Sequence, residues 1–201
     1  MRTIVSICFL LLGFFLIFSP QIEKKFSDSK QDHLIEAFEN LGNISVHEEA
    51  EMPIEVQANA DEEKPALLEG ARGIVRIPAI ELEMMIFEGA SESSLTKGIG
   101  MIEPDKEFDV HNVGLAGHRS TTKGKQFNRL DELALQDVIE VQTESGTYEY
   151  EIVDTFVVDQ SEVHVLDDQK DALLTLVTCT PLGKKNPTDR LIVQAKIKTI
   201  N

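Results

Sequence analysis

Strand-forming segments follow one another at short intervals from about residue 71 to the C-terminus, and this spacing limits the folds open to the chain. Apolar and β-branched residues alternate or cluster in short runs bounded by Gly, Pro, Asn and Asp, a pattern typical of strands. The runs are 73–80, 81–87, 112–118, 137–143, 147–159, 173–179 and 190–197. Seven or eight strands with brief connections in one domain-sized block predict a mainly β fold, a closed or nearly closed barrel around one core.

The sequence also predicts the structure of several connections between these strands. Residues 137–143 and 147–159 alternate with a period of two on either side of a short turn at residues 144–146, which predicts a β-hairpin. Residues 93–104 and 127–135 predict short helices between strands.

The first 20 residues have a different character. Residues 3–19 carry no charge and contain Cys8, and their length is at the lower limit for a helix that spans a bilayer. A cleaved signal peptide is the alternative, but no small-x-small cleavage site follows the run. The sequence therefore predicts an uncleaved membrane anchor over residues 1–20. Arg2 before the run and Lys24 and Lys25 after it do not decide its orientation.

Residues 21–70 form an acidic connection, or stalk, with 13 Asp and Glu against 4 Lys and Arg. Within it, residues 28–41 place Leu34, Ile35, Phe38 and Leu41 on one helical face, which predicts a short docking helix. The remainder contains two prolines and predicts a linker. The whole chain has a net charge of −16, which argues against nucleic acid as a partner.

Cys179 ends the apolar run 173–179 and is followed two residues later by Pro181. If Cys8 lies in lipid, Cys179 is the sole thiol of the rest of the chain and cannot form a disulfide within it. Such a cysteine is either a buried apolar filler or a reactive thiol.

Antiparallel pairing of runs 173–179 and 190–197 would place Cys179 and Arg190 at the same rim of the sheet. Strand alternation would turn Leu174, Leu176 and Thr178 to one face, with Cys179 on the other. A nearby cation favours the thiolate, and a guanidinium offers a fixed fork of donors to a developing oxyanion.

His118 is the histidine that ends a strand, with Gly117 before it to allow close backbone approach and Arg119 and Ser120 opening a polar loop after it. A cysteine with an adjacent imidazole suits acyl transfer through a thioester. The ordinary alternatives stay open at this point: Cys179 as a packed small residue, His118 as a surface residue and Arg190 as an edge-strand residue.

Three motifs in order, GHR at 117–119, TLVTC at 175–179 and DRLIV at 189–193, resemble the sortases, the membrane-anchored cysteine transpeptidases of bacteria. The similarity covers roughly residues 71–200 and includes Phe127 and Leu130 just beyond the histidine. It implies an eight-stranded sortase β-barrel with short helices for residues 71–201, preceded by an N-terminal transmembrane helix.

The resemblance also implies an activity. Cys179 would attack the Thr–Gly bond of an LPXTG-like sorting signal and form a thioester. His118 would be the general acid and then the general base, and Arg190 would hold the substrate backbone and the oxyanion. Binding roles would fall to Ala116, Val177 and Thr178.

The implied partners are proteins with LPXTG-like signals, an amine of a peptidoglycan precursor or another amine acceptor, and the membrane. The implied location is the cell membrane of a Gram-positive bacterium, with one transmembrane pass and an extracytoplasmic catalytic domain. The loop after Cys179 suits neither a pilin-polymerising nor a housekeeping sortase cleanly, and the subclass stays open between housekeeping (class A-like) and class D-like.

We expect no cofactor to be required. Some housekeeping sortases bind calcium through acidic residues, and Glu103, Asp105, Asp109 and Asp168 lie in comparable places here, with Lys106 among them. Oxygen ligands suit Ca²⁺, so calcium is the alternative.

Two other functions remain as alternatives. One is a non-catalytic extracytoplasmic β-barrel that binds peptides or wall polymer, with an inert, buried thiol. The other is a cysteine peptidase that uses water in place of the amine.

Overall fold

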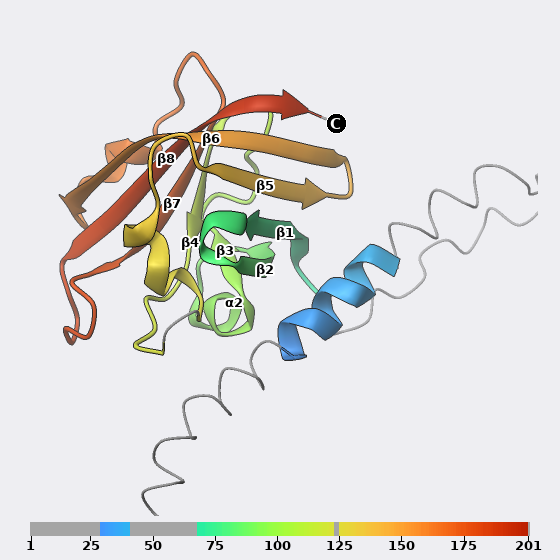
Figure 1. Cartoon of the computed structure of the whole chain (residues 1–201), viewed down its shortest axis with the longest axis horizontal. Coiled ribbons are helices and arrows are strands. Elements are labelled where there is room, and N and C mark those ends of the chain that lie inside the picture. Colours follow the sequence, from blue (N-terminus) through green and yellow to red (C-terminus); the bar gives the residue numbers. More distant parts are fainter. Residues whose placement is uncertain (1–28, 41–67, 123–124, 201) are drawn as a thin grey trace, which may run out of the picture.

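The computed structural model describes residues 29–40, 68–122 and 125–200. Within this part of the chain, eight strands form one sheet (Figure 1). In chain order they are β1 (Ala71–Ile77), β2 (Leu82–Glu88), β3 (Ile99–Met101), β4 (Asn112–Ala116), β5 (Val138–Thr143), β6 (Gly146–Asp159), β7 (Leu173–Thr180) and β8 (Asp189–Ile200). Short helices connect them: η2 (Pro78–Ile80), α2 (Glu92–Lys97), η3 (Phe127–Glu132) and η4 (Val163–Leu166).

The sheet closes into a barrel in the order β1-β2-β3-β4-β7-β8-β6-β5, with β5 paired to β1. The β2–β3 and β4–β7 pairs are parallel, and the other neighbours are antiparallel. Closure leaves no long free edge, which is how all-β folds avoid edge-to-edge association. The predicted mainly β barrel of eight strands is therefore confirmed.

The core fills the barrel interior. Inward-facing residues of successive strands, such as Ile86, Leu115, Val141 and Leu176, are fully buried in one cluster. Tyr150 is buried there too; its hydroxyl donates a hydrogen bond to the Phe108 carbonyl, and burial raises the pKa of the phenol. The alternation predicted for the strands has its physical basis here, because one face of each strand packs into this core.

Several predicted elements end earlier than expected. The first strand stops at Ile77 because the chain turns through η2 at Pro78, and the strand predicted over 112–118 ends at Ala116. The helix predicted over 127–135 is a 3₁₀ helix that ends at Glu132. The predicted hairpin is confirmed as β5 and β6.

The helix predicted over residues 93–104 is wrong in its second half. The helical part is α2, and Ile99–Met101 form β3, which pairs with β2 on one side and β4 on the other. A strand of three residues is too short to show a period, and only its partners define it.

The predicted docking helix is confirmed over residues 29–40 and lies beside β1 (blue in Figure 1). Leu34, Ile35 and Phe38 are buried in a second apolar cluster on the outside of β1 and β2, together with residues such as Ile74 and Phe87. Leu41, the fourth residue predicted for this face, lies outside the described residues.

Polar contacts fix the position of this helix. Gln31 accepts a hydrogen bond from the Met85 amide (3.1 Å) and donates one to the Lys97 carbonyl (2.6 Å). Glu39 pairs with Arg76 at 2.9 Å.

The predicted membrane anchor and most of the acidic stalk lie outside the described residues. Of the helices that are described, none combines the length and the apolar character needed to cross a bilayer.

Candidate active site

Cys179 and Arg190 are direct cross-strand partners. Strand β7 pairs antiparallel with β8, and Cys179 stands opposite Arg190, one pair before the end of the ladder. Residues directly opposite in an antiparallel pair point to the same face, with Cβ atoms about 4.5–5.5 Å apart. Leu176 and Leu191 face the core, so Cys179 and Arg190 face outward. The thiol is free and half-buried, not enclosed in the apolar interior.

His118 lies at the matching end of β4. The parallel β4–β7 ladder ends with Ala116 opposite Val177, so two residues further on each chain come His118 and Cys179. The three side chains predicted to do the chemistry thus lie on neighbouring strand ends, at one rim of the barrel. His118 is 43% exposed, and its Nε2 is 3.8 Å from the Glu92 carboxylate at the start of α2.

Gly117 and Thr178 hold the two strand ends together. The Gly117 amide donates to the Val177 carbonyl (3.1 Å), and the Thr178 hydroxyl donates to the Gly117 carbonyl (2.8 Å). A Cβ on Gly117 would lie 2.6 Å from the Phe127 ring and 2.8 Å from Ile99, so only glycine fits without displacing them. This is the close approach that the sequence predicted.

The expectation that Thr178 lines the substrate site needs a correction. Thr178 is 2% exposed and lies on the opposite face of β7 from Cys179, and its hydroxyl is used by the Gly117 carbonyl. Its contribution is to join β7 to the backbone before His118. Ala116 and Val177, the other two predicted binding residues, are half-buried and lie side by side on the outer face next to Cys179.

The segment between β6 and β7 covers the other end of this outer face. A Cβ on Gly114, in the middle of β4, would lie 2.8 Å from Leu166 of η4, so η4 rests directly on the strand. The outer face of β4 and β7 is therefore covered near Gly114 and more open toward Ala116, Val177 and Cys179.

Arg190 is held by its own surroundings. Its guanidinium donates to the carbonyls of Pro187 (2.7 Å) and Asp189 (3.0 Å) and to the Gln160 side chain (2.9 Å). Hydrogen bonds from Ser161, with a further effect of the Arg190 charge, lower the pKa of Asp159. These contacts hold the guanidinium against the loop before β8 and the residue after β6.

Arg119 is the residue of this region whose importance the sequence did not indicate. The sequence assigned it only to a polar loop, but its side chain is 8% exposed. It pairs with Asp131 at 2.8 Å and donates to the Thr180 hydroxyl at 2.9 Å. Its position inside the GHR motif is the one signal that could have drawn attention to it.

Lys106 lies among the acidic residues considered for calcium, in contact with two of them. The Lys106 ammonium lies 2.9 Å from Glu103, 3.2 Å from Asp168, and 2.8 and 3.2 Å from the carbonyls of Leu166 and Asn112. Within the described ranges, no group of three or more His, Cys, Asp or Glu residues could hold a metal. Oxygen atoms of the kind that Ca²⁺ prefers surround the positive charge of Lys106 here.

The charges of this cluster stabilise one another. Burial lowers the pKa of Lys106, but the hydrogen bonds and charges of Glu103 and Asp168 outweigh it, and the net effect raises the pKa. The hydrogen bond from the Asn112 amide lowers the pKa of Asp168, and the hydrogen bond and charge of Lys106 lower it further. The cluster ties the segment between β6 and β7 to the loop before β4.

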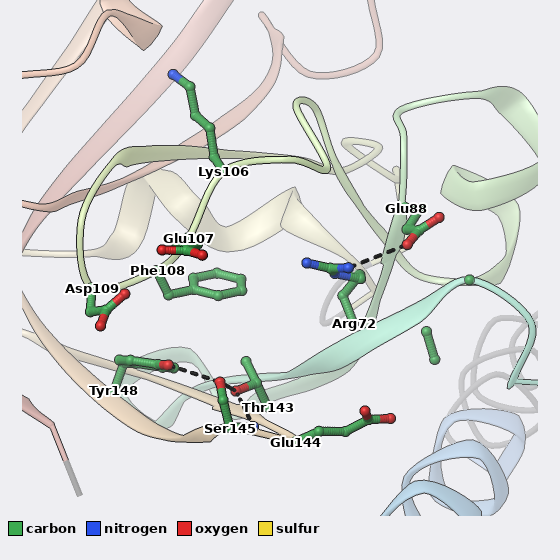
Figure 2. A pocket seen from close by; sticks show the side chains of 12 residues that line it. Arg72, Glu88, Lys106, Glu107, Phe108, Asp109, Thr143, Glu144, Ser145 and Tyr148 are labelled. Atoms are coloured by element: carbon green, nitrogen blue, oxygen red, sulfur yellow. Dashed lines mark hydrogen bonds and ion pairs between the residues drawn. The ribbon is translucent and has the colours of Figure 1, made fainter.

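A hollow of about 590 Å³ lies elsewhere on the barrel, and none of the residues that line it is His118, Cys179 or Arg190. Figure 2 shows Arg72 directed at Glu88, with which it pairs at 3.4 Å, and Lys106 extending away from the other labelled residues. The Phe108 and Tyr148 rings stack at 5.8 Å at its base.

Comparison with known families gives a match over most of the barrel. The family described as "Sortase domain" matches residues 75–198. Sortase A of Listeria monocytogenes serovar 1/2a is 25% identical over 194 residues, which covers 89% of this chain and 84% of that protein. Sortase D of Bacillus subtilis strain 168 is 34% identical over 130 residues, or 63% of each chain.

Solved structures agree with these matches. The crystal structure of L. monocytogenes sortase A has a TM-score of 0.61 and 26% identity, covering 66% of this chain and 90% of that one. Sortase C1 of Streptococcus agalactiae has a TM-score of 0.60 and 30% identity, covering 66% and 69%. Relatives called A, C and D all appear at similar distances, so these matches do not assign a subclass.

Proposed function

The chain belongs to the sortase family of cysteine transpeptidases, and from this we propose that it cleaves an LPXTG-like sorting signal and joins the released protein to an amine of the cell wall. The observation that carries the proposal is the placement of His118, Cys179 and Arg190 at the ends of three neighbouring strands, β4, β7 and β8.

The proposed reaction has two halves. The Cys179 thiolate attacks the threonine carbonyl carbon, the Thr–Gly bond breaks, and a thioester forms while His118 protonates the leaving amine. In the second half, His118 accepts a proton from the incoming amine, which attacks the thioester and releases the thiolate. Arg190, the cross-strand partner of Cys179, would donate from its guanidinium to the oxyanion in both halves.

Substrate binding is proposed for the outer face next to the thiol. Ala116 and Val177 present small and branched apolar side chains there, side by side across the β4–β7 ladder. Such a surface suits the leucine and proline side of the signal. η4, which rests on Gly114, would border it on the side away from the thiol.

The membrane location is a proposal from the sequence. Residues 1–20 would cross the membrane once and place the barrel outside the cytoplasm, where sorting signals and wall precursors meet. The acidic residues of the connection over 21–70 would be repelled by an anionic membrane surface.

The test uses the full chain with a fluorogenic peptide that contains Leu-Pro-Glu-Thr-Gly, and with triglycine or hydroxylamine as the amine. We expect peptide cleavage and a ligated product or a hydroxamate, because hydroxylamine captures a thioester whatever the natural acceptor is. Cleavage that is indifferent to graded amine, with only hydrolysed product, would instead identify a cysteine peptidase.

Thiol labelling separates the enzyme from a binding module. Because Cys179 is half-buried and free, we expect an alkylating agent to modify it in the folded chain and to stop turnover. Labelling that requires denaturation, with no cleavage of any peptide, would favour the non-catalytic barrel.

Activity is also expected to be independent of calcium. Because Lys106 supplies the positive charge between Glu103 and Asp168, adding calcium chloride or EDTA should change kcat/KM by less than about twofold. Lys106→Met should lower the free energy of unfolding by about 1–3 kcal/mol, because the carbonyls that the ammonium serves lose their donor.

Lys170→Met is the matched control, since it removes an exposed lysine from the segment between β6 and β7 that Lys106 contacts, and it should leave stability nearly unchanged. Thermal unfolding and peptide cleavage measure both effects. A fivefold stimulation of the unaltered chain by calcium would contradict the proposal.

A further inference from the structure

We propose that Arg119 is a positioning residue that sets the separation of His118 and Cys179. This inference rests on the proposed function of those two residues. The guanidinium of Arg119 makes two contacts, with the Asp131 carboxylate of η3 at 2.8 Å and with the Thr180 hydroxyl at 2.9 Å.

These contacts join segments that are distant in sequence. Arg119 directly follows His118, and Thr180 directly follows Cys179, so one hydrogen bond links the residues next to the two reacting side chains. Asp131 belongs to η3, whose first residue, Phe127, donates its amide to the His118 carbonyl at 3.1 Å. The guanidinium thereby connects the His118 backbone, the end of β7 and η3.

A second set of contacts lies on the other side of the reacting residues. The Gly117 backbone is bound to Val177 and Thr178, as described above. His118 and Cys179 therefore lie between two cross-links, one through Gly117 and one through Arg119. Without the second, the residue after His118 would lose its side-chain link to the end of β7.

Burial makes the second cross-link stiff. The Arg119 side chain is 8% exposed, and its Nε is buried without a hydrogen-bond partner in the described part of the chain. Burying a guanidinium with one donor unsatisfied costs free energy, so the arrangement is maintained against a penalty. The buried guanidinium lies beside the reacting groups but is not directed at them. A positioning role accounts for this arrangement.

The expected result concerns the rate and not substrate binding. Arg119→Met should lower kcat about 10- to 100-fold for the Leu-Pro-Glu-Thr-Gly peptide, because a displacement of about 1 Å between reacting groups has an effect of this size. KM should change by less than about twofold. Arg119→Lys keeps the charge but lacks the fork that reaches both partners, so it should restore kcat only in part.

Thr180 gives a test that does not depend on the large arginine substitution. Thr180→Val removes the acceptor at nearly constant shape and should lower kcat about fivefold, while Thr180→Ser should restore it. The double variant with Arg119→Met should be no slower than Arg119→Met alone, because both changes break the same link.

Arg129 provides the matched control. It is also mostly buried, pairs with Glu132 at 2.7 Å and donates to the Ile80 carbonyl at 2.8 Å, but it contacts η2 instead of β7. Arg129→Met should lower the melting temperature and leave kcat, measured well below that temperature, within about twofold. Equal kcat in the Arg119→Met and Arg129→Met variants would overturn the proposal.

A second readout needs no substrate. In a Cys8→Ala background, iodoacetamide should alkylate Cys179 at least fivefold more slowly in Arg119→Met than in Arg129→Met, because an adjacent imidazole favours the reactive thiolate. If the unaltered chain cleaves no peptide, the proposed substrate is wrong, and the alkylation rates alone decide the role of Arg119. Unchanged alkylation in Arg119→Met and Thr180→Val would refute it.

Discussion

A full chain with alanine in place of Cys179 should form neither cleaved nor ligated peptide, with a loss of turnover on the order of 10⁴-fold or more. The reason is that the thioester forms on this sulfur and no neighbouring group replaces it. The measurement is peptide cleavage in the presence of triglycine, followed by mass spectrometry of the enzyme for the acyl adduct.

Cys8→Ala is the control for this experiment, since it removes the other cysteine of the chain from a segment with no proposed part in the chemistry. It should keep full activity. Turnover that survives in Cys179→Ala, at a rate comparable to that of Cys8→Ala, would remove the basis of the proposed mechanism.

His118→Ala should lower both the rate of thioester formation and the rate of its aminolysis by about 10³-fold. One imidazole serves as acid in the first half and as base in the second, so both halves should slow. Rapid mixing with the fluorogenic peptide reports the first half, and the disappearance of the acyl-enzyme after addition of hydroxylamine reports the second.

Glu92→Gln is the matched control for the histidine. Glu92 approaches the imidazole at 3.8 Å but is 86% exposed, and an ion pair between exposed groups contributes little. We expect its rates to stay within about threefold of the unaltered chain. A comparable loss in both variants, or a His118→Ala variant that slows neither half, would assign the proton transfers to another group.

The barrel and part of its site could be predicted because they depend on residues that are close together in the sequence. β7 and β8 are consecutive strands joined by one loop, so the opposition of Cys179 and Arg190 follows from antiparallel pairing. The buried face of the helix over residues 29–40 likewise follows from the spacing of its apolar residues. The predicted strand ends are less accurate. β1 ends where the chain turns at Pro78, and β4 ends at Ala116, two residues before the predicted end.

Other features depended on partners far along the chain. His118 and Cys179 are 61 residues apart in sequence, and only the parallel pairing of β4 with β7 brings them together; the motif resemblance, not the strand pattern, linked them beforehand. The sequence predicts β3 as part of a helix, because three residues carry no period. The pairing of the Lys106 ammonium with Glu103 and Asp168 follows only from the tertiary structure, because Asp168 is distant in the sequence.

By itself, the sequence determined which segments become strands, which face of each is apolar, and which residue types could carry acyl transfer. Tertiary structure decided that Thr178 faces away from the thiol, that Arg119 is buried between η3 and β7, and that Lys106 occupies the place considered for calcium. The physical reason is that alternation and turns are set by neighbouring residues, whereas burial and charge pairing arise only when closure of the barrel brings distant segments into contact.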